Sequence, residues 1–202
     1  MLTFELLAEY VMEQCAAIKM KDVTYTQPGS IKYELFGPEP SEQSVCIQMG
    51  KVGERIIKKI IIHNENLELL DCGNHCINSL TKKKKDLDLL WVDHRARCIY
   101  YREAKANIEL DSEKIIATVD KILEISNYLR EKYPGYRIDA GLYHWTIYNR
   151  TPLKKGLSQI KKCEENGIKV EHPEELFKLL NFECSEAAYS ALWRKAGKFF
   201  RE

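Results

Sequence analysis

The sequence YYREAKANIELDSEK (residues 100–114) changes character half-way along. Its first part alternates as a β-strand does, and the two-residue period places Glu103 and Lys105 on one face. Asp111 and Glu113 then suit the start of a helix, because aspartate caps free N–H groups and an acid favours the positive end of the helix dipole. We therefore expect a strand over residues 97–106 that exposes an acid beside a base, followed by a helix.

The segment DLDLLWVD (residues 86–93) predicts the strand that comes before. Alternation places Asp86 and Asp88 on one face of that strand and its apolar side chains on the other. A turn at residues 94–96 would join the two strands into a hairpin. If the acidic faces coincide, two carboxylates and an ammonium group meet at one end of a sheet.

Such a group of charges predicts a cation site. Carboxylates in a partly buried site repel one another and lose hydration, so they need a partner of opposite charge. The oxygen ligands of Asp88 and Glu103 suit Mg²⁺, which binds through one or two carboxylates plus a substrate phosphate. Lys105 would orient or activate an attacking water. The pattern therefore favours phosphodiester hydrolysis over acyl or hydride transfer.

Asp88, a gap, and the EAK of residues 103–105 together resemble the PD-(D/E)xK nuclease signature. The longer block EAKANIELDSEK is similar to type II restriction endonucleases of that superfamily. In the order of its elements the resemblance covers roughly residues 50–150, although Leu87 stands where the proline of the family's name would be. It implies an α/β restriction-endonuclease-like fold, with a mixed central sheet flanked by helices, and Mg²⁺ as cofactor.

The resemblance also implies roles for single residues. Asp88 resembles the metal-bridging aspartate, Glu103 the second metal ligand and Lys105 the catalytic lysine. The backbone carbonyl of Ala104 would be a further metal ligand.

Two more acidic residues are candidates for the same site. Asp86 faces the same way as Asp88 and is its rival for the bridging role; Asp88 is preferred because it lies inside the apolar run. Glu54, in the middle of an expected helix, matches the helix glutamate that some family members place beside the metal. An ordinary exposed position on that helix is the alternative for Glu54.

Contacts with DNA must come from local positive charge, because 31 Lys and Arg residues nearly balance 30 Asp and Glu residues. The run of four lysines before the acid-bearing strand fits either a solvated turn or a contact with the phosphate backbone. Arginine and asparagine can read guanine and adenine edges in the major groove. The candidate DNA-binding residues are Lys82, Lys83, Lys84, Lys85, Asn107, Asn149, Arg150, Lys154 and Lys155.

The rest of the chain predicts alternating helices and strands, an order typical of α/β proteins. Helices are expected over residues 2–20, 44–62, 112–132, 156–165, 173–181 and 185–200, and further strands over residues 67–70, 136–148 and 167–171. We expect a single nuclease domain over residues 1–202, with its catalytic core at about 45–180. Residues 21–43 would be a loop or arm, and residues 185–202 a C-terminal helix.

Composition narrows the environment of the protein. Its seven cysteines are an odd number without the density of a disulfide scaffold, so we expect reduced thiols in the cytoplasm. Cys72, His75 and Cys76, with His94 and Cys98, do not follow a zinc-site spacing. No run approaches the length of a membrane span, so no membrane partner is expected.

Similarity to type II restriction enzymes implies a homodimer that cuts both strands of a short palindrome in double-stranded DNA. It also implies a cognate DNA methyltransferase as a separate protein. A structure-specific or repair nuclease of the same fold, such as a Holliday-junction resolvase, is one alternative. A non-catalytic DNA-binding protein is another.

Overall fold

A computed structural model describes residues 2–21, 23–78, 81–106, 108, 114–153 and 156–201. Two compact units divide the chain. Residues 57–182 form a unit built around a β-sheet, called here the sheet unit, and residues 2–56 with those from 183 onward form a helical unit. The single-domain organisation expected from the sequence stays a prediction.

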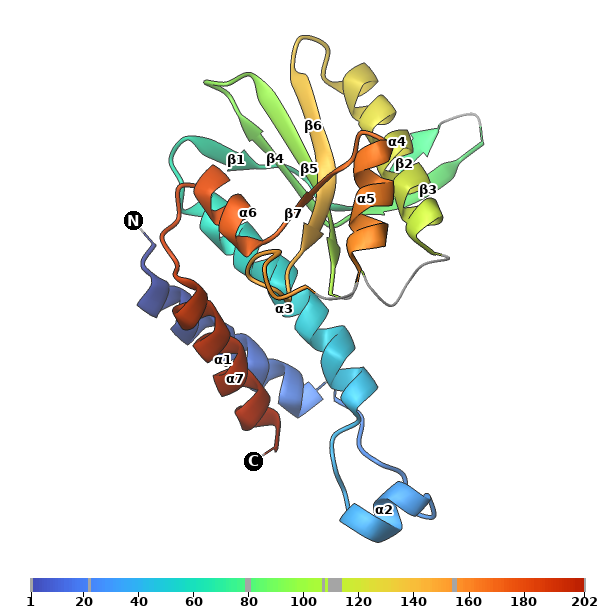
Figure 1. The fold of residues 1–202 in the computed structure, drawn as a ribbon, viewed down its shortest axis with the longest axis vertical. Helices are drawn as coiled ribbons and strands as arrows, with labels where there is room; N and C mark the ends of the chain where they lie inside the picture. The colour runs from blue at the N-terminus through green and yellow to red at the C-terminus, as the bar shows by residue number, and fades with distance from the viewer. Residues whose placement is uncertain are drawn as a thin grey trace. The chain divides into compact units, whose positions relative to one another are not determined.

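The sheet unit contains a mixed five-stranded sheet in the order β1-β4-β5-β6-β7 (Figure 1). β4 pairs antiparallel with both β1 and β5, whereas β5, β6 and β7 run parallel to one another. A mixed sheet with helices against it confirms the α/β class. The strands are β1 (Leu67–Leu69), β4 (Leu89–Asp93), β5 (Cys98–Lys105), β6 (Arg137–His144) and β7 (Lys169–Glu171).

The helices α4 (Lys114–Lys132) and α5 (Leu157–Glu165) share a hydrophobic core with this sheet. The buried face of α4 is an apolar stripe that includes Ile115, Val119, Ile122 and Leu129. The helix α6 (Pro173–Leu179) packs against β6 and β7, with His172 as its N-cap and proline in its first turn, where no N–H is needed. These helices begin and end close to the positions that the sequence predicts.

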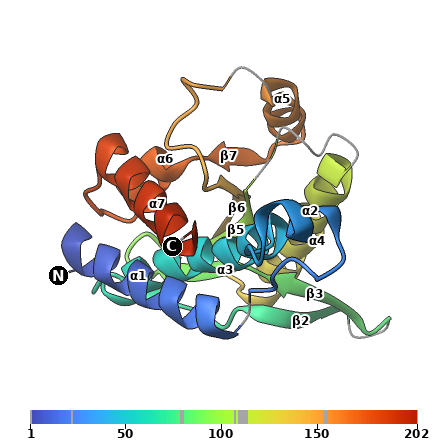
Figure 2. The same ribbon diagram turned by 90° about the horizontal axis from the view of Figure 1, so that it is seen from below.

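A second, two-stranded sheet differs from expectation. β2 (Gly73–Asn78) and β3 (Lys83–Leu87) pair antiparallel, where the sequence suggests only turns at residues 71–78 and at the lysine run (Figure 2). Because β2 is polar, its own sequence does not indicate a strand. It becomes one by pairing with β3. Because β3 pairs with β2 and β4 pairs with β5, the expected continuous strand over residues 86–93 is interrupted at Asp88.

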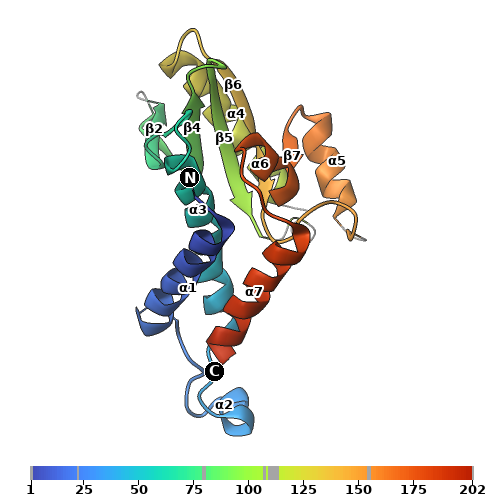
Figure 3. The ribbon, with the colours of Figure 1, turned by 90° about the vertical axis from the view of Figure 1, so that its left-hand side faces the viewer.

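The helical unit consists of α1 (Phe4–Lys21), α2 (Ile31–Phe36), residues 42–56 of α3 (Glu42–Ile62) and α7 (Glu186–Arg201). α1 and α7 run side by side (Figure 3). The segment expected to be a loop or arm contains the short helix α2, which Ser30 caps and which buries none of its residues. Across the described part of the chain, no helix is long and apolar enough to cross a membrane.

Candidate active site

Asp88 lies where the chain leaves the two-stranded sheet and enters the five-stranded one, between β3 and β4. Its Oδ2 accepts a hydrogen bond of 2.8 Å from the backbone N–H of Ala104 on β5. This bond holds the carboxylate against the strand at the point between Glu103 and Lys105. The acid and the E-x-K segment that the sequence pairs are therefore neighbours in the structure.

Glu103 is a buried carboxylate with a cation at each oxygen. Lys105 Nζ lies 3.0 Å from its Oε1, and Lys121 Nζ, from α4, lies 2.5 Å from its Oε2. Tyr101, two residues earlier on the same face of β5, donates its hydroxyl hydrogen to Oε2 at 2.8 Å. Burial by itself raises the pKa of Glu103, but Lys105, Lys121 and Tyr101 outweigh it and lower the pKa below its usual value. Glu103 is thus ionised at neutral pH.

Tyr101 has a buried hydroxyl group that donates to the Glu103 carboxylate. Burial raises the pKa of Tyr101 far above its ordinary range, and the negative charges of Glu103, Asp88 and Asp86 raise it further. Tyr101 therefore remains a neutral donor that faces a group of carboxylates.

The donor set at this place suits a hard divalent cation. Asp88 accepts from the N–H of Ala104, the residue that follows Glu103, and the buried Glu103 carboxylate already has two cationic partners. Within the described ranges, no group of three or more His, Cys, Asp or Glu side chains could hold a metal ion. Mg²⁺ does not need such a group, because it commonly binds through one or two carboxylates and completes its shell with water and phosphate.

The two further acidic candidates have different positions. Asp86 is exposed on β3, opposite Asn74 of β2, whereas Asp88 lies between β3 and β4. The contact with Ala104 favours Asp88 over Asp86 for the bridging role, which stays a prediction. Glu54 lies on α3 within the helical unit, and its metal role stays a prediction as well.

On the opposite face of β5 the charges are reversed, and a buried cation is paired with carboxylates. The fully buried guanidinium of Arg102 donates from Nε to Glu171 Oε2 at 2.7 Å and pairs through its second terminal nitrogen with Asp139 Oδ1 at 2.8 Å. Burial raises the pKa of Glu171, but Arg102 and then Lys169 outweigh it and lower the pKa below its usual value. This network ties β5 to β6 and β7 and thereby fixes the strand that carries Glu103.

Two buried histidines lie near the carboxyl end of β5. His144 of β6 is aligned with Lys105 and hydrogen-bonds through Nε2 to the carbonyl of Ala106 at 2.9 Å. The ring of His172 stands at 62° to that of His144, with centroids 5.2 Å apart. His144 and the following Trp145 are both buried.

The four lysines considered as DNA contacts lie at the start of the second strand of the β2–β3 hairpin, with Lys82 just before β3 and the other three on it. Lys82 and Lys84 are exposed. Lys83 and Lys85 pair instead with Glu124 of α4, at 2.5 Å and 3.5 Å. A DNA phosphate would have to compete with Glu124 for these two ammonium groups, so Lys82 and Lys84 are the better candidates for backbone contact.

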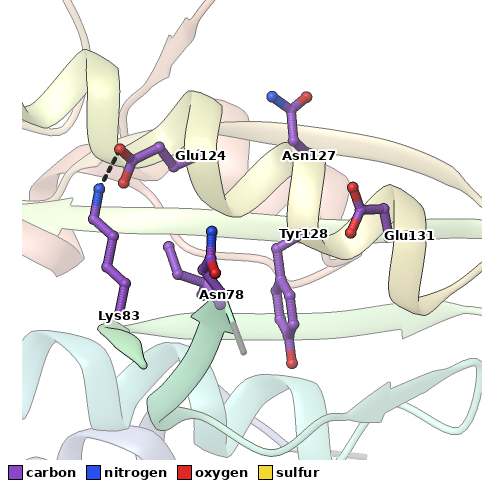
Figure 4. Close-up of a pocket in the computed structure, with 7 residues that line it drawn as sticks. Asn78, Lys83, Glu124, Asn127, Tyr128 and Glu131 are labelled. Atoms are coloured by element: carbon purple, nitrogen blue, oxygen red, sulfur yellow. Dashed lines mark hydrogen bonds and ion pairs between the residues drawn. The ribbon is translucent and has the colours of Figure 1, made fainter. Parts of the chain in front are cut away.

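A pocket of about 430 Å³ lies beside this ion pair, between the hairpin and α4. Figure 4 shows Lys83 extended towards Glu124, with amide and phenol side chains beside them. Asn78, Lys83, Glu124, Asn127, Tyr128 and Glu131 line the pocket.

The remaining DNA candidates are less accessible or lie outside the described residues. Arg150 donates to the carbonyl of Val170 and pairs with Glu164, both at 2.8 Å, so it anchors its own loop. Asn149 Oδ1 accepts from the N–H of Thr151 at 3.0 Å, which forms a turn. The residues outside the described ranges are Asn107, Lys154 and Lys155.

Two participants are missing from the sequence-based candidates. Tyr101 could have been found, because the two-residue period puts it on the face of Glu103. Lys121 could not have been singled out, because it lies beside the apolar stripe of α4 among other polar residues.

Comparison with known proteins adds little. No family model matches this chain, and no curated protein matches it. Among solved structures it is similar to protein VC1899 from Vibrio cholerae, with a TM-score of 0.41 and 14% sequence identity over 96% of this chain and 52% of that chain. The chain therefore spans about half the length of the solved chain. A likeness this distant assigns no function.

Proposed function

We propose that this protein is a Mg²⁺-dependent deoxyribonuclease of the PD-(D/E)xK type with a restriction-endonuclease-like fold. The observation that supports it best is the hydrogen bond from Ala104 N–H to Asp88. It brings the acid of one segment beside the E-x-K of the next strand. The buried, ionised Glu103 beside Lys105 supports the same conclusion.

The residues divide the work as follows. Asp88 and Glu103, with the carbonyl of Ala104, would hold Mg²⁺. When bound, Mg²⁺ supplies positive charge to the phosphodiester and makes an attacking water more acidic. Lys105, which is partly exposed while Glu103 is buried, orients the attacking water and stabilises negative charge on the phosphate oxygens. Tyr101 holds the Glu103 carboxylate in place by its hydroxyl.

The proposed substrate is double-stranded DNA with a short specific sequence, cut by a homodimer as in type II restriction enzymes. Two-fold protein symmetry would match a palindromic site. A cognate methyltransferase, encoded separately, would protect host DNA. The exposed Lys82 and Lys84 are the phosphate contacts favoured above.

The first experiment incubates the purified protein with phage DNA and either Mg²⁺ or EDTA. Discrete fragments that form only with Mg²⁺ would support a restriction enzyme. A smear, or cutting of branched DNA alone, would favour a repair nuclease or a junction resolvase. DNA binding without cleavage would contradict the catalytic proposal.

The second experiment uses isosteric variants of the site. Asp88→Asn, Glu103→Gln and Lys105→Gln should each reduce the cleavage rate by at least about 100-fold, because each removes a charge that binds metal or acts on the phosphate. Asp86→Asn is the matched control and should cut normally. Thermal melting of each variant separates loss of chemistry from loss of folding. Normal cleavage by Asp88→Asn together with an inactive Asp86→Asn would transfer the bridging role to Asp86.

A further inference from the structure

Lys121 contacts the candidate active site without belonging to its sequence motif. Its ammonium group lies 2.5 Å from Glu103 Oε2, and its side chain is 19% exposed against 39% for Lys105. It comes from α4, a helix whose neighbouring turns are fixed by buried residues such as Ile122. The contact is therefore held by the packing of the helix on the sheet.

The number of charges around Glu103 is unusual. One buried carboxylate needs one counter-ion, yet Lys105 and Lys121 supply two, one at each oxygen. Two ammonium groups close to one carboxylate repel each other. Asp88, held against the N–H of Ala104, adds negative charge next to this strand.

A divalent cation competes with this arrangement at one oxygen, Glu103 Oε2. That oxygen already accepts from both Tyr101 and Lys121, which uses its two lone pairs. Mg²⁺ binds carboxylate oxygen at about 2.0–2.1 Å, so a metal ion that binds Oε2 must displace one of these two partners. Lys105 is assigned to the substrate, whereas Lys121 contacts the same oxygen as Tyr101.

We propose that Lys121 is a positioning residue that takes the place of the metal: its ammonium group holds the Glu103 carboxylate while the metal is absent and yields that oxygen to Mg²⁺. The inference rests on the proposed nuclease function. In this proposal the Lys121 ammonium group and the metal ion compete directly for the same oxygen of Glu103. Removing a residue that contacts a metal site usually weakens metal binding. Here the competition predicts the opposite, so removing Lys121 should strengthen metal binding.

The test measures binding of Mg²⁺, and of Mn²⁺ as a probe, to the full chain by calorimetry without DNA. Lys121→Gln should bind the metal about three- to tenfold more tightly than the wild type, since a competing cation is gone. Lys121→Arg keeps the cation and should restore the wild-type affinity. Lys132→Gln is the matched control on the same helix, because the Lys132 ammonium lies over the rings of Tyr128 and Tyr133 instead of a carboxylate.

Cleavage assays with the same variants give the second readout. Lys121→Gln should reach half-maximal cleavage at a lower Mg²⁺ concentration, with little change in KM for DNA. If Lys121 had only a structural role, both Lys121→Gln and Lys121→Arg would bind the metal more weakly and melt at a lower temperature.

The outcomes separate this inference from the function on which it rests. If the wild type cuts DNA and Lys121→Gln binds metal with unchanged or lower affinity, the role of Lys121 is overturned and the nuclease function stands. If the wild type neither binds metal nor cuts DNA, both are overturned. Tighter metal binding by Lys121→Gln alone, with Lys132→Gln unchanged, supports the proposal.

Discussion

Protonation of His172 links the stability of the fold to pH. It is fully buried, and burial lowers the pKa of its ring to about 4, with His144 and Arg150 adding to the effect. In the unfolded chain a histidine titrates near pH 6.5. Between these values the unfolded state takes up a proton that the folded state does not, so stability is full above pH 6.5 and falls as the pH drops towards 4.

Urea unfolding at several pH values between 6.5 and 5 checks this prediction. The wild type should lose about 1 kcal/mol per pH unit in this window, a slope set by one linked proton. His172→Gln cannot titrate and should lose less over the same window. His63→Gln, the same change at an exposed histidine, is the control and should keep the wild-type slope. Equal slopes for His172→Gln and the wild type would contradict the linkage.

At the scale of single residues, most of the candidate site that could be predicted from the sequence follows from the two-residue period of a strand. It places Glu103 beside Lys105, and the hairpin brings Asp88 to the same strand, as the contact with Ala104 shows. The contact of Lys121 depends on how α4 is rotated and shifted on the sheet. That geometry is set by packing along the whole helix, and no local pattern encodes it.

Among the elements, the parallel pair β6–β7 depends on one small residue. A Cβ added at Gly141 would lie 2.8 Å from the backbone carbonyl oxygen of Lys169 and 3.4 Å from Cδ of Arg102. Gly141→Ala should therefore lower the free energy of unfolding by about 1–3 kcal/mol, because backbone or the buried arginine must move. Urea denaturation followed by circular dichroism measures the loss.

The control for this substitution is Gly50→Ala, where an added Cβ meets no atom within 4 Å in the described structure. Gly50 lies within α3, so alanine there should raise stability by about 0.5–1 kcal/mol through helix propensity. A neutral Gly141→Ala would show that β7 can shift at little cost.

Elements with a strong apolar period could be predicted, and those without one could not. The stripe of α4 and the near-continuous apolar run of β4 are visible in the sequence. β2 is polar and exists through its partner β3, and α2 depends on the cap at Ser30 while it buries nothing. Pairing with another strand decided β2, and a local cap without an apolar stripe decided α2.

For the whole molecule, the proposed homodimer makes a kinetic prediction. A dimer with two equivalent sites should convert a supercoiled plasmid with one recognition site directly to the linear form, because both strands are cut in one binding event. At low protein concentration the rate should fall more steeply than in proportion to concentration, since the dimer dissociates. Accumulation of nicked circles at all concentrations would indicate a monomer that cuts one strand at a time. Gel electrophoresis of the time course distinguishes the two.

The α/β class could be predicted from the order of the elements, whereas the division into two compact units could not. The apolar stripe of α3 runs through the whole helix, although residues 42–56 belong to one unit and residues 57–62 to the other. A local pattern reports that a face is buried, and it does not report which neighbour buries it.

The opposite charges on the two faces of β5 favour the correct register of this strand in the sheet. On one face a buried cation, Arg102, is surrounded by acids, and on the other a buried anion, Glu103, is surrounded by ammonium groups. A slip of one residue would exchange the faces, so that Glu103 would meet Glu171 and Asp139, or Arg102 would meet Lys121. Both misaligned pairings place like charges together in the interior. The same charges that are proposed to act on DNA therefore also exclude wrong alignments of the central strand while the chain folds.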